Sequence, residues 1–71
     1  MTLATILAHE RSRQRLTLRA LEALCGVSNA TISQIEHGVN AEPSFAKVRA
    51  IVTGLGRSLA WLERKLRETP T

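Results

Sequence analysis

Residues 17–38, TLRALEALCGVSNATISQIEHG, decide the fold that we predict for this chain. The stretch reads as two short helices joined by a tight turn. Thr17 and Ser28 can cap the two helices, because a side-chain hydroxyl accepts a hydrogen bond from a free backbone N–H of the first turn. Gly26 and Gly38 follow the helices, where a left-handed backbone is common and glycine adopts it at least cost. Both ends of both helices are therefore specified locally.

The second helix of this stretch has a polar face without charge. Apolar residues turn inward along the whole stretch: Leu18, Leu21, Cys25, Val27, Ile32 and Ile35. The second helix is left with these outward residues: Asn29, Ala30, Thr31, Ser33 and Gln34. A merely solvated helix face usually carries Lys and Glu. Amide and hydroxyl side chains instead suit hydrogen bonds to base edges, which predicts a helix that contacts DNA.

These features resemble the helix-turn-helix domain of the phage Cro/CI repressors and related XRE-like regulators. The resemblance rests on residues 16–38, LTLRALEALCGVSNATISQIEHG, and residues 43–62, PSFAKVRAIVTGLGRSLAWL. It implies an all-α fold, a compact lambda-repressor-like bundle of about five short helices with the motif at the second and third. It also implies a structural ion pair between Arg11 on the first helix and Glu36 at the end of the recognition helix.

Two positions depart from the pattern of that family. Glu22 stands where relatives usually have a small residue, at the crossing of the two motif helices. Its carboxylate must reach outward, or the crossing must widen. Leu18 stands where many relatives have a glutamine that holds a phosphate, so one backbone contact is missing.

Three further helices are predicted around the motif. The first runs from its cap, Thr2, through about Arg13. The fourth is capped by Ser44 and ends at Gly54 and Gly56, after a loop at residues 39–43. Its predicted inward residues are Phe45, Val48, Ile51 and Val52.

The last predicted helix, capped by Ser58, offers a second surface. Its apolar stripe consists of Leu59, Leu62 and Leu66. Because few elements remain to cover it, and because the last helix meets its two-fold mate in similar repressor domains, we predict a homodimer interface there. Trp61 is assigned to the core. Residues 1–68 are taken as one domain, and the tail, residues 69–71, is expected to fray.

The candidate DNA contacts divide into base readers and phosphate contacts. The base readers are Asn29, Ala30, Thr31 and Gln34. The phosphate contacts are Arg13, Arg15, Thr17, Ser28, His37, Asn40, Ser44 and Lys47. Several have a simpler alternative. Arg13 and Arg15 also suit a solvated helix end, His37 and Asn40 suit loop capping, Ser44 suits an N-cap, and Lys47 suits any surface.

The composition bounds what the chain can do. Its 71 residues, 44% hydrophobic with a net charge of +4, suit one small folded domain with a polyanionic partner. The single cysteine, Cys25, excludes an intramolecular disulfide and is predicted to be a small buried residue. No catalytic constellation, metal-ligand spacing or membrane-spanning run is evident. We therefore expect no enzyme activity, metal, cofactor, small-molecule ligand or membrane contact, and a cytoplasmic location.

The predicted function is that of a sequence-specific regulator of transcription that binds double-stranded DNA in the major groove. A phage-type repressor, dimeric on a two-fold operator, fits best. Two alternatives stay open, an antitoxin of a toxin–antitoxin pair and a protein-interaction module that keeps the fold without binding DNA. The lack of Lys and Arg on the recognition helix, with Leu18 and Glu22, slightly favours the interaction module.

Overall fold

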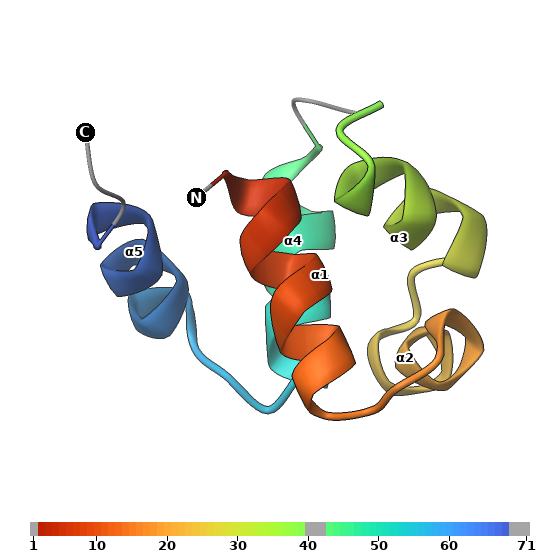
Figure 1. The fold of residues 1–71 in the computed structure, drawn as a ribbon. Coiled ribbons are helices and arrows are strands. Elements are labelled where there is room, and N and C mark those ends of the chain that lie inside the picture. Colours follow the sequence, from red (N-terminus) through yellow and green to blue (C-terminus); the bar gives the residue numbers. More distant parts are fainter. Residues whose placement is uncertain (1, 40–42, 69–71) are drawn as a thin grey trace.

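The computed structural model describes residues 2–39 and 43–68, and over these residues it is all-helical. Its helices are α1 (Leu3–Arg13), α2 (Leu18–Cys25), α3 (Asn29–Glu36), α4 (Phe45–Gly54) and α5 (Leu59–Arg67) (Figure 1). The predicted fold class is confirmed, with the motif at α2 and α3. The expected phosphate contact Asn40 and the expected frayed tail, residues 69–71, lie outside the described residues.

Every helix begins at a hydroxyl side chain that caps it. The capping residues are Thr2, Thr17, Ser28, Ser44 and Ser58, and each accepts a hydrogen bond from the backbone N–H three residues on. The motif helices also end as predicted. Gly26 has a φ of +77° directly after α2, and Gly38 has a φ of +74° one residue beyond the cap of α3. Residues close in sequence therefore specify where each helix begins and where the motif helices end.

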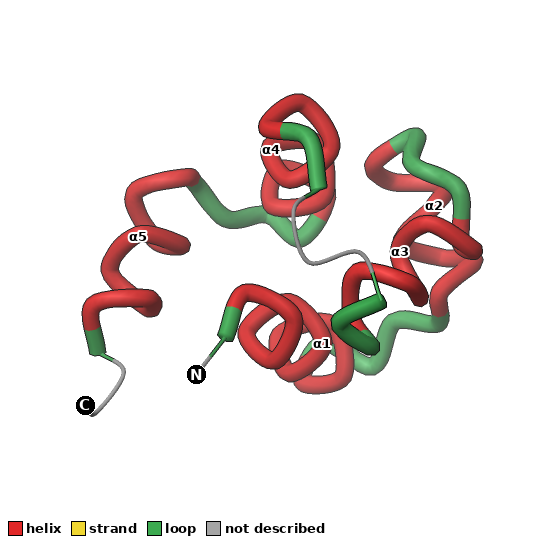
Figure 2. Tube along the Cα trace, turned by 90° about the horizontal axis from the view of Figure 1, so that it is seen from above, coloured by secondary structure: helices red, strands yellow, loops and turns green. Residues whose placement is uncertain are grey.

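The helices pack with α1 and α4 in the middle of the domain. Figures 1 and 2 show α5 on one side of this pair and the α2–α3 unit on the other. The side chains of the core that are almost fully covered are Leu7, Leu21, Ile32, Ile35, Ile51 and Val52. They come from α1, α2, α3 and α4, so one aliphatic core holds the motif against the rest of the domain. Trp61, from α5, is also buried, as predicted.

The contact between α2 and α4 is close because Gly54 has no side chain. A Cβ built at Gly54 would lie 2.7 Å from Cβ of Cys25, closer than real Cβ atoms approach, and 3.2 Å from its Cα. Cys25 is half-buried in this contact, and its thiol lies 3.4 Å from the backbone N–H of Val27. The absence of a side chain at Gly54 therefore allows α4 to pack closely against α2, and Gly54 is also the last residue of α4.

Two predicted burial assignments are wrong. Phe45 was expected to face inward, but 64% of it is exposed. It occupies the first turn of α4, at the edge of the face that Val48, Ile51 and Val52 bury, where no other described helix covers it. Leu62 was expected in an exposed dimer stripe, but only 6% of it is exposed because it packs into the core beside Trp61.

A buried carboxylate joins α1 to the connection between α4 and α5. Glu10 is 7% exposed. One of its oxygens accepts hydrogen bonds from Arg13 at 2.7 Å, Gln14 at 2.8 Å and Arg57 at 3.1 Å. The Gln14 amide also donates to the carbonyl of Leu55 at 2.7 Å. Arg13 first, with Gln14 and Arg57, outweighs the effect of burial and lowers the pKa of Glu10 to about 2.

This cluster predicts a specific loss of stability in acid. The pKa of Glu10 is lower in the folded chain than its ordinary 4.5, so its contribution is complete above pH 4.5 and is lost as the pH falls toward 2. Between about pH 5 and pH 2, the free energy of unfolding should fall by on the order of 3 kcal/mol through this group. Urea unfolding at both pH values, on the wild type and on Glu10→Gln, measures the difference.

The control for this experiment is Glu63→Gln, which neutralises an exposed carboxylate on α5. Glu63→Gln should keep the acid sensitivity of the wild type, whereas Glu10→Gln should lose most of it. Equal acid sensitivity in the wild type and Glu10→Gln would show that the Glu10 cluster does not stabilise the fold.

Candidate nucleic-acid interface

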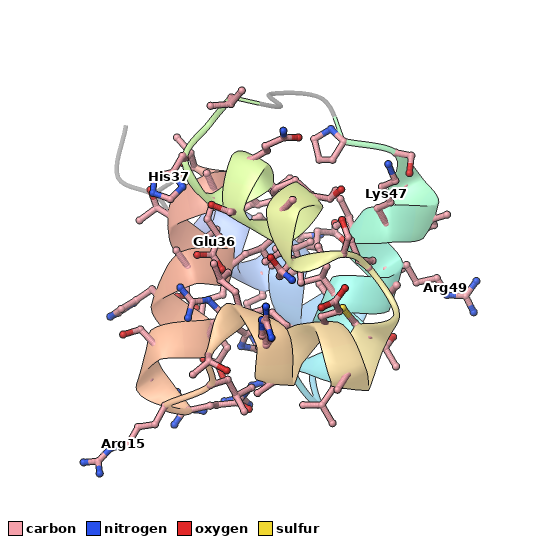
Figure 3. All side chains as sticks on the ribbon, turned by 90° about the vertical axis from the view of Figure 1, so that its right-hand side faces the viewer. Arg15, Glu36, His37, Lys47 and Arg49 are labelled. Atoms are coloured by element: carbon pink, nitrogen blue, oxygen red, sulfur yellow. The ribbon has the colours of Figure 1, made fainter. Side chains whose placement is uncertain are left out.

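The outward face of α3 is the surface on which the predicted base readers come together. Figure 3 looks onto α2 and α3, with α3 crossing above α2. Ala30 and Gln34 are exposed on α3, and Asn29 and Thr31 are half-buried. Ile32 and Ile35, on the opposite side, are buried in the core. The helix is therefore fixed in rotation, with its uncharged polar side toward solvent.

The four predicted base readers are not equally free. The hydroxyl of Thr31 accepts a hydrogen bond from the Ser28 hydroxyl at 2.8 Å, as part of the N-cap of α3. The amide nitrogen of Asn29 donates to Glu22 on α2 at 3.0 Å. Gln34 and Ala30 are the exposed members, one of them polar and one apolar. The structure thus separates exposed readers from readers that already hold a protein partner.

The predicted phosphate contacts lie around the motif rather than on α3. Thr17, Ser28 and Ser44 are exposed N-cap residues of three successive helices. Their helix N-termini carry free N–H groups and a partial positive charge, which suits a phosphate. His37 caps the end of α3, with Nδ1 2.7 Å from the carbonyl oxygen of Ser33. Lys47 is exposed in the first turn of α4.

Arg13 and Arg15, treated alike in the sequence, are distinguished by the structure. The guanidinium of Arg13 donates two hydrogen bonds to Glu10, at 3.0 and 2.7 Å, so a phosphate would compete with that carboxylate. Arg15 has a left-handed backbone with a φ of +59° after α1, and its side chain extends away from the domain (Figure 3). Such a backbone is strained for a residue with a Cβ. Arg15 is the better candidate for a phosphate.

The predicted ion pair between Arg11 and Glu36 is present and joins α1 to α3. Nε of Arg11 lies 2.7 Å from Oε2 of Glu36, and Nη2 lies 2.9 Å from Oε1. Nη1 donates to the carbonyl of Leu16 at 2.6 Å. The Glu36 side chain is 5% exposed and the Arg11 side chain 21%. The Glu36 carboxylate also raises the pKa of Arg11, which keeps the guanidinium charged.

Three features of this region were not anticipated from the sequence. One is the cluster around Glu10, whose partners come from both ends of the chain. Another is the use of Glu22 as the partner of Asn29. The third is a shallow apolar hollow between α2 and α4, where Leu24 and Phe45 are exposed next to Arg49. The contacts of Glu10 with Arg57 and of Asn29 with Glu22, and the hollow, depend on how the helices pack, which sequence spacing does not report.

The comparison with known families agrees with this geometry. The helix-turn-helix family model matches residues 7–62, which span α2, α3 and α4 in full, most of α1 and the first turn of α5. The chain therefore belongs to the helix-turn-helix family of the Cro/CI (XRE-like) type, a class of DNA-binding transcription regulators. Searches of curated proteins and of solved structures gave no match.

Two further properties of the described residues bear on partners. No helix among them has the length and apolar character that crossing a membrane requires. No group of three or more His, Cys, Asp or Glu side chains comes together there in a way that could hold a metal ion.

The Arg11–Glu36 pair predicts a large penalty when one partner is removed. Glu36→Ala should lower the free energy of unfolding by about 3 kcal/mol, because it leaves a partly buried guanidinium with only the Leu16 carbonyl. Glu63→Ala, which breaks an exposed pair with Arg67 on α5, should lower it by less than about 1 kcal/mol.

A double-mutant cycle isolates the pair itself. Arg11→Met with Glu36→Leu should be less destabilised than the sum of the single variants, since no charge is left unpaired. Additive losses in urea unfolding would mean that the two side chains do not interact energetically.

Proposed function

We propose that this domain binds a specific double-stranded DNA site as a dimeric repressor of transcription, with α3 in the major groove. The observation that carries the proposal is the outward face of α3, where an exposed Gln34 and Ala30 are flanked by the polar Asn29 and Thr31. An amide can bind adenine in bidentate fashion, and a small apolar side chain can contact a thymine methyl. An uncharged reading helix favours base recognition over general attraction to phosphate.

Affinity in this proposal comes from the surroundings of α3. Arg15, Lys47 and Arg49 are exposed around the α2–α3 face (Figure 3). Together with the N-termini of α2 and α4, these cations suit phosphates on either side of the groove. The net charge of +4 acts in the same direction.

A dimer would supply the rest of the affinity. One short helix contacts few bases, and two copies about 34 Å apart can enter successive major grooves on one side of DNA. The second contact is then intramolecular and benefits from effective concentration. With Leu62 assigned to the core, the candidate surface is narrower than predicted. It consists of Leu66, 42% exposed, and the half-buried Leu59 at the start of the same helix.

Two observations favour the interaction module as a second candidate. The described residues of α3 include neither Lys nor Arg, and Leu18 at the start of α2 packs against the core instead of offering a hydrogen bond to phosphate. A domain that had lost DNA binding would show the same two features. Binding to a pool of random DNA fragments, with sequencing of the retained fragments, separates the two candidates.

The readout by α3 can be tested with Gln34→Ala. The variant should bind the selected site with about 1–3 kcal/mol less free energy and lose preference at one or two base positions, while binding to random DNA stays unchanged. Fluorescence anisotropy on both DNAs measures this. An equal loss on selected and random DNA would assign Gln34 to general binding.

The phosphate contact can be tested with Arg15→Gly. Glycine suits the left-handed backbone of residue 15, so the variant should be as stable as the wild type or up to about 1 kcal/mol more stable. Its DNA affinity should nevertheless fall equally on all sequences, and the slope of log K against log salt should decrease by about one. A loss of binding then cannot arise from a loss of folding. An unchanged slope would place Arg15 away from the DNA.

The interface can be tested with Leu66→Glu. The new charge would face its symmetry mate, while the core keeps Trp61 and Leu62. We expect the circular dichroism spectrum to stay unchanged and the cooperative loading of two copies on DNA to be lost. Sedimentation equilibrium of the protein–DNA complex measures how many copies are bound. Ala60→Glu, at an exposed position nearer the start of α5, is the control and should still load two copies. Cooperative loading by Leu66→Glu would exclude this part of α5 as the interface.

A further inference from the structure

Glu22 and Asn29 make a contact that links the two motif helices at the DNA-facing surface. Nδ2 of Asn29, the first residue of α3, lies 3.0 Å from Oε1 of Glu22 on α2. Both side chains are half-buried, so neither is a freely moving surface group. Glu22 stands at the helix crossing where a small residue was expected, and its carboxylate reaches outward far enough to meet the amide.

The chemistry of the pair fixes the orientation of the Asn29 amide. An ionised carboxylate can only accept hydrogen bonds, so the group that faces Glu22 must be the NH₂ of the amide and cannot be its oxygen. The amide oxygen is then turned away from Glu22. No fully buried side-chain oxygen or nitrogen among the described residues lacks a partner, and Asn29 Oδ1 accepts no hydrogen bond from them, so this oxygen is not fully buried.

A fixed amide reads fewer bases than a free one. Asparagine can ordinarily rotate its side-chain amide and present either a donor or an acceptor to the major groove. With its oxygen held outward, Asn29 presents that acceptor, and its NH₂ has only one N–H left beside the one that faces Glu22. The bases that offer a donor in the major groove are adenine, through N6, and cytosine, through N4. Guanine and thymine offer only acceptors there and leave the oxygen unpaired.

We propose that Glu22 is a positioning residue for specificity, which orients Asn29 so that the domain selects adenine or cytosine at the base that Asn29 faces. The proposal rests on the proposed function, since it assumes that α3 reads bases. Glu22 itself makes no base contact in it. Its carboxylate acts through Asn29 alone.

The contact can be tested first without DNA. In the NMR spectrum of the free protein, the side-chain amide signals of Asn29 should shift in Glu22→Met, which keeps an unbranched side chain but replaces the carboxylate with a thioether, at most a weak acceptor. The control Glu68→Gln also removes one negative charge, from the end of α5, and should leave these signals unchanged. The same spectra show whether each variant is folded. Identical Asn29 signals in the wild type and Glu22→Met would overturn the proposal whatever the DNA results.

The consequence for specificity is tested by selection from random double-stranded DNA. Asn29→Ala locates the relevant position, as the one where preference disappears. There the wild type should prefer adenine or cytosine by about tenfold over guanine or thymine. Glu22→Gln, whose amide can face Asn29 with either its donor or its acceptor, and Glu22→Met should reduce this ratio to about twofold or less. Preferences at the other positions should not change, and in an Asn29→Ala background neither change at Glu22 should have a further effect.

The possible results separate this proposal from the proposed function. If the wild type enriches a sequence and both Glu22 variants keep the preference at the Asn29 position, the proposed function stands and the role of Glu22 is rejected. If the ratio falls equally in Glu68→Gln, charge alone is responsible, and the role of Glu22 is also rejected. If the wild type enriches no sequence at all, both proposals fail.

Discussion

The bidentate pair between Arg11 and Glu36 is the contact on which the orientation of the motif depends. One guanidinium binds the carboxylate at the end of α3 and the carbonyl of Leu16, just before the cap of α2. It therefore fixes α1, the entry to α2 and the end of α3 with a single planar group. A planar guanidinium with several donors sets both distance and angle, which a lysine or an apolar pair would leave freer. We interpret the pair as a device for geometry more than for stability, since buried ion pairs often contribute little net stability.

A second arginine–glutamate cluster plays a matching part at the other side of the domain. Glu10 gathers Arg13, Gln14 and Arg57, and so connects α1 to the segment that leads into α5. Arg57 also lies over the ring of Trp61, at 5.4 Å from its centroid. The core is small and almost wholly aliphatic, so it defines relative helix positions weakly by shape alone. Directional polar contacts on both sides of α1 fix the relative helix positions that a larger core would fix by its shape.

The sequence predicted those parts of the structure that depend on neighbours in the chain. All five caps and the glycine conformations after α2 and α3 involve residues at most a few positions apart, and each was predictable from one hydroxyl or one glycine.

The predictions that depended on tertiary packing were less accurate. Helical spacing predicted that Phe45 is buried and Leu62 exposed. Burial depends on which element packs against a residue, and in the structure Phe45 is exposed and Leu62 is buried. Arg13 and Arg15 were not separated from the sequence. The i,i+3 spacing of Glu10 and Arg13 was a local signal for their contact, whereas the left-handed backbone of Arg15 becomes visible only in three dimensions. The contact of Asn29 with Glu22 was missed for the same reason, since the two residues meet only through the angle of the α2–α3 crossing.

The charge distribution of the motif suggests a division of tasks between helices. In the described structure, α3 carries polar but uncharged side chains outward, while the exposed cations Arg15, Lys47 and Arg49 lie on the segments around it. Attraction to phosphate is independent of sequence, so cations on the reading helix would strengthen wrong sites as much as right ones. Hydrogen bonds from amides act differently, because a mismatched base leaves a polar group unpaired and is penalised. A reading helix of this kind gains discrimination at the expense of affinity. In the proposed function, the affinity that α3 lacks would come from the cations around it and from a second copy held at the exposed end of α5.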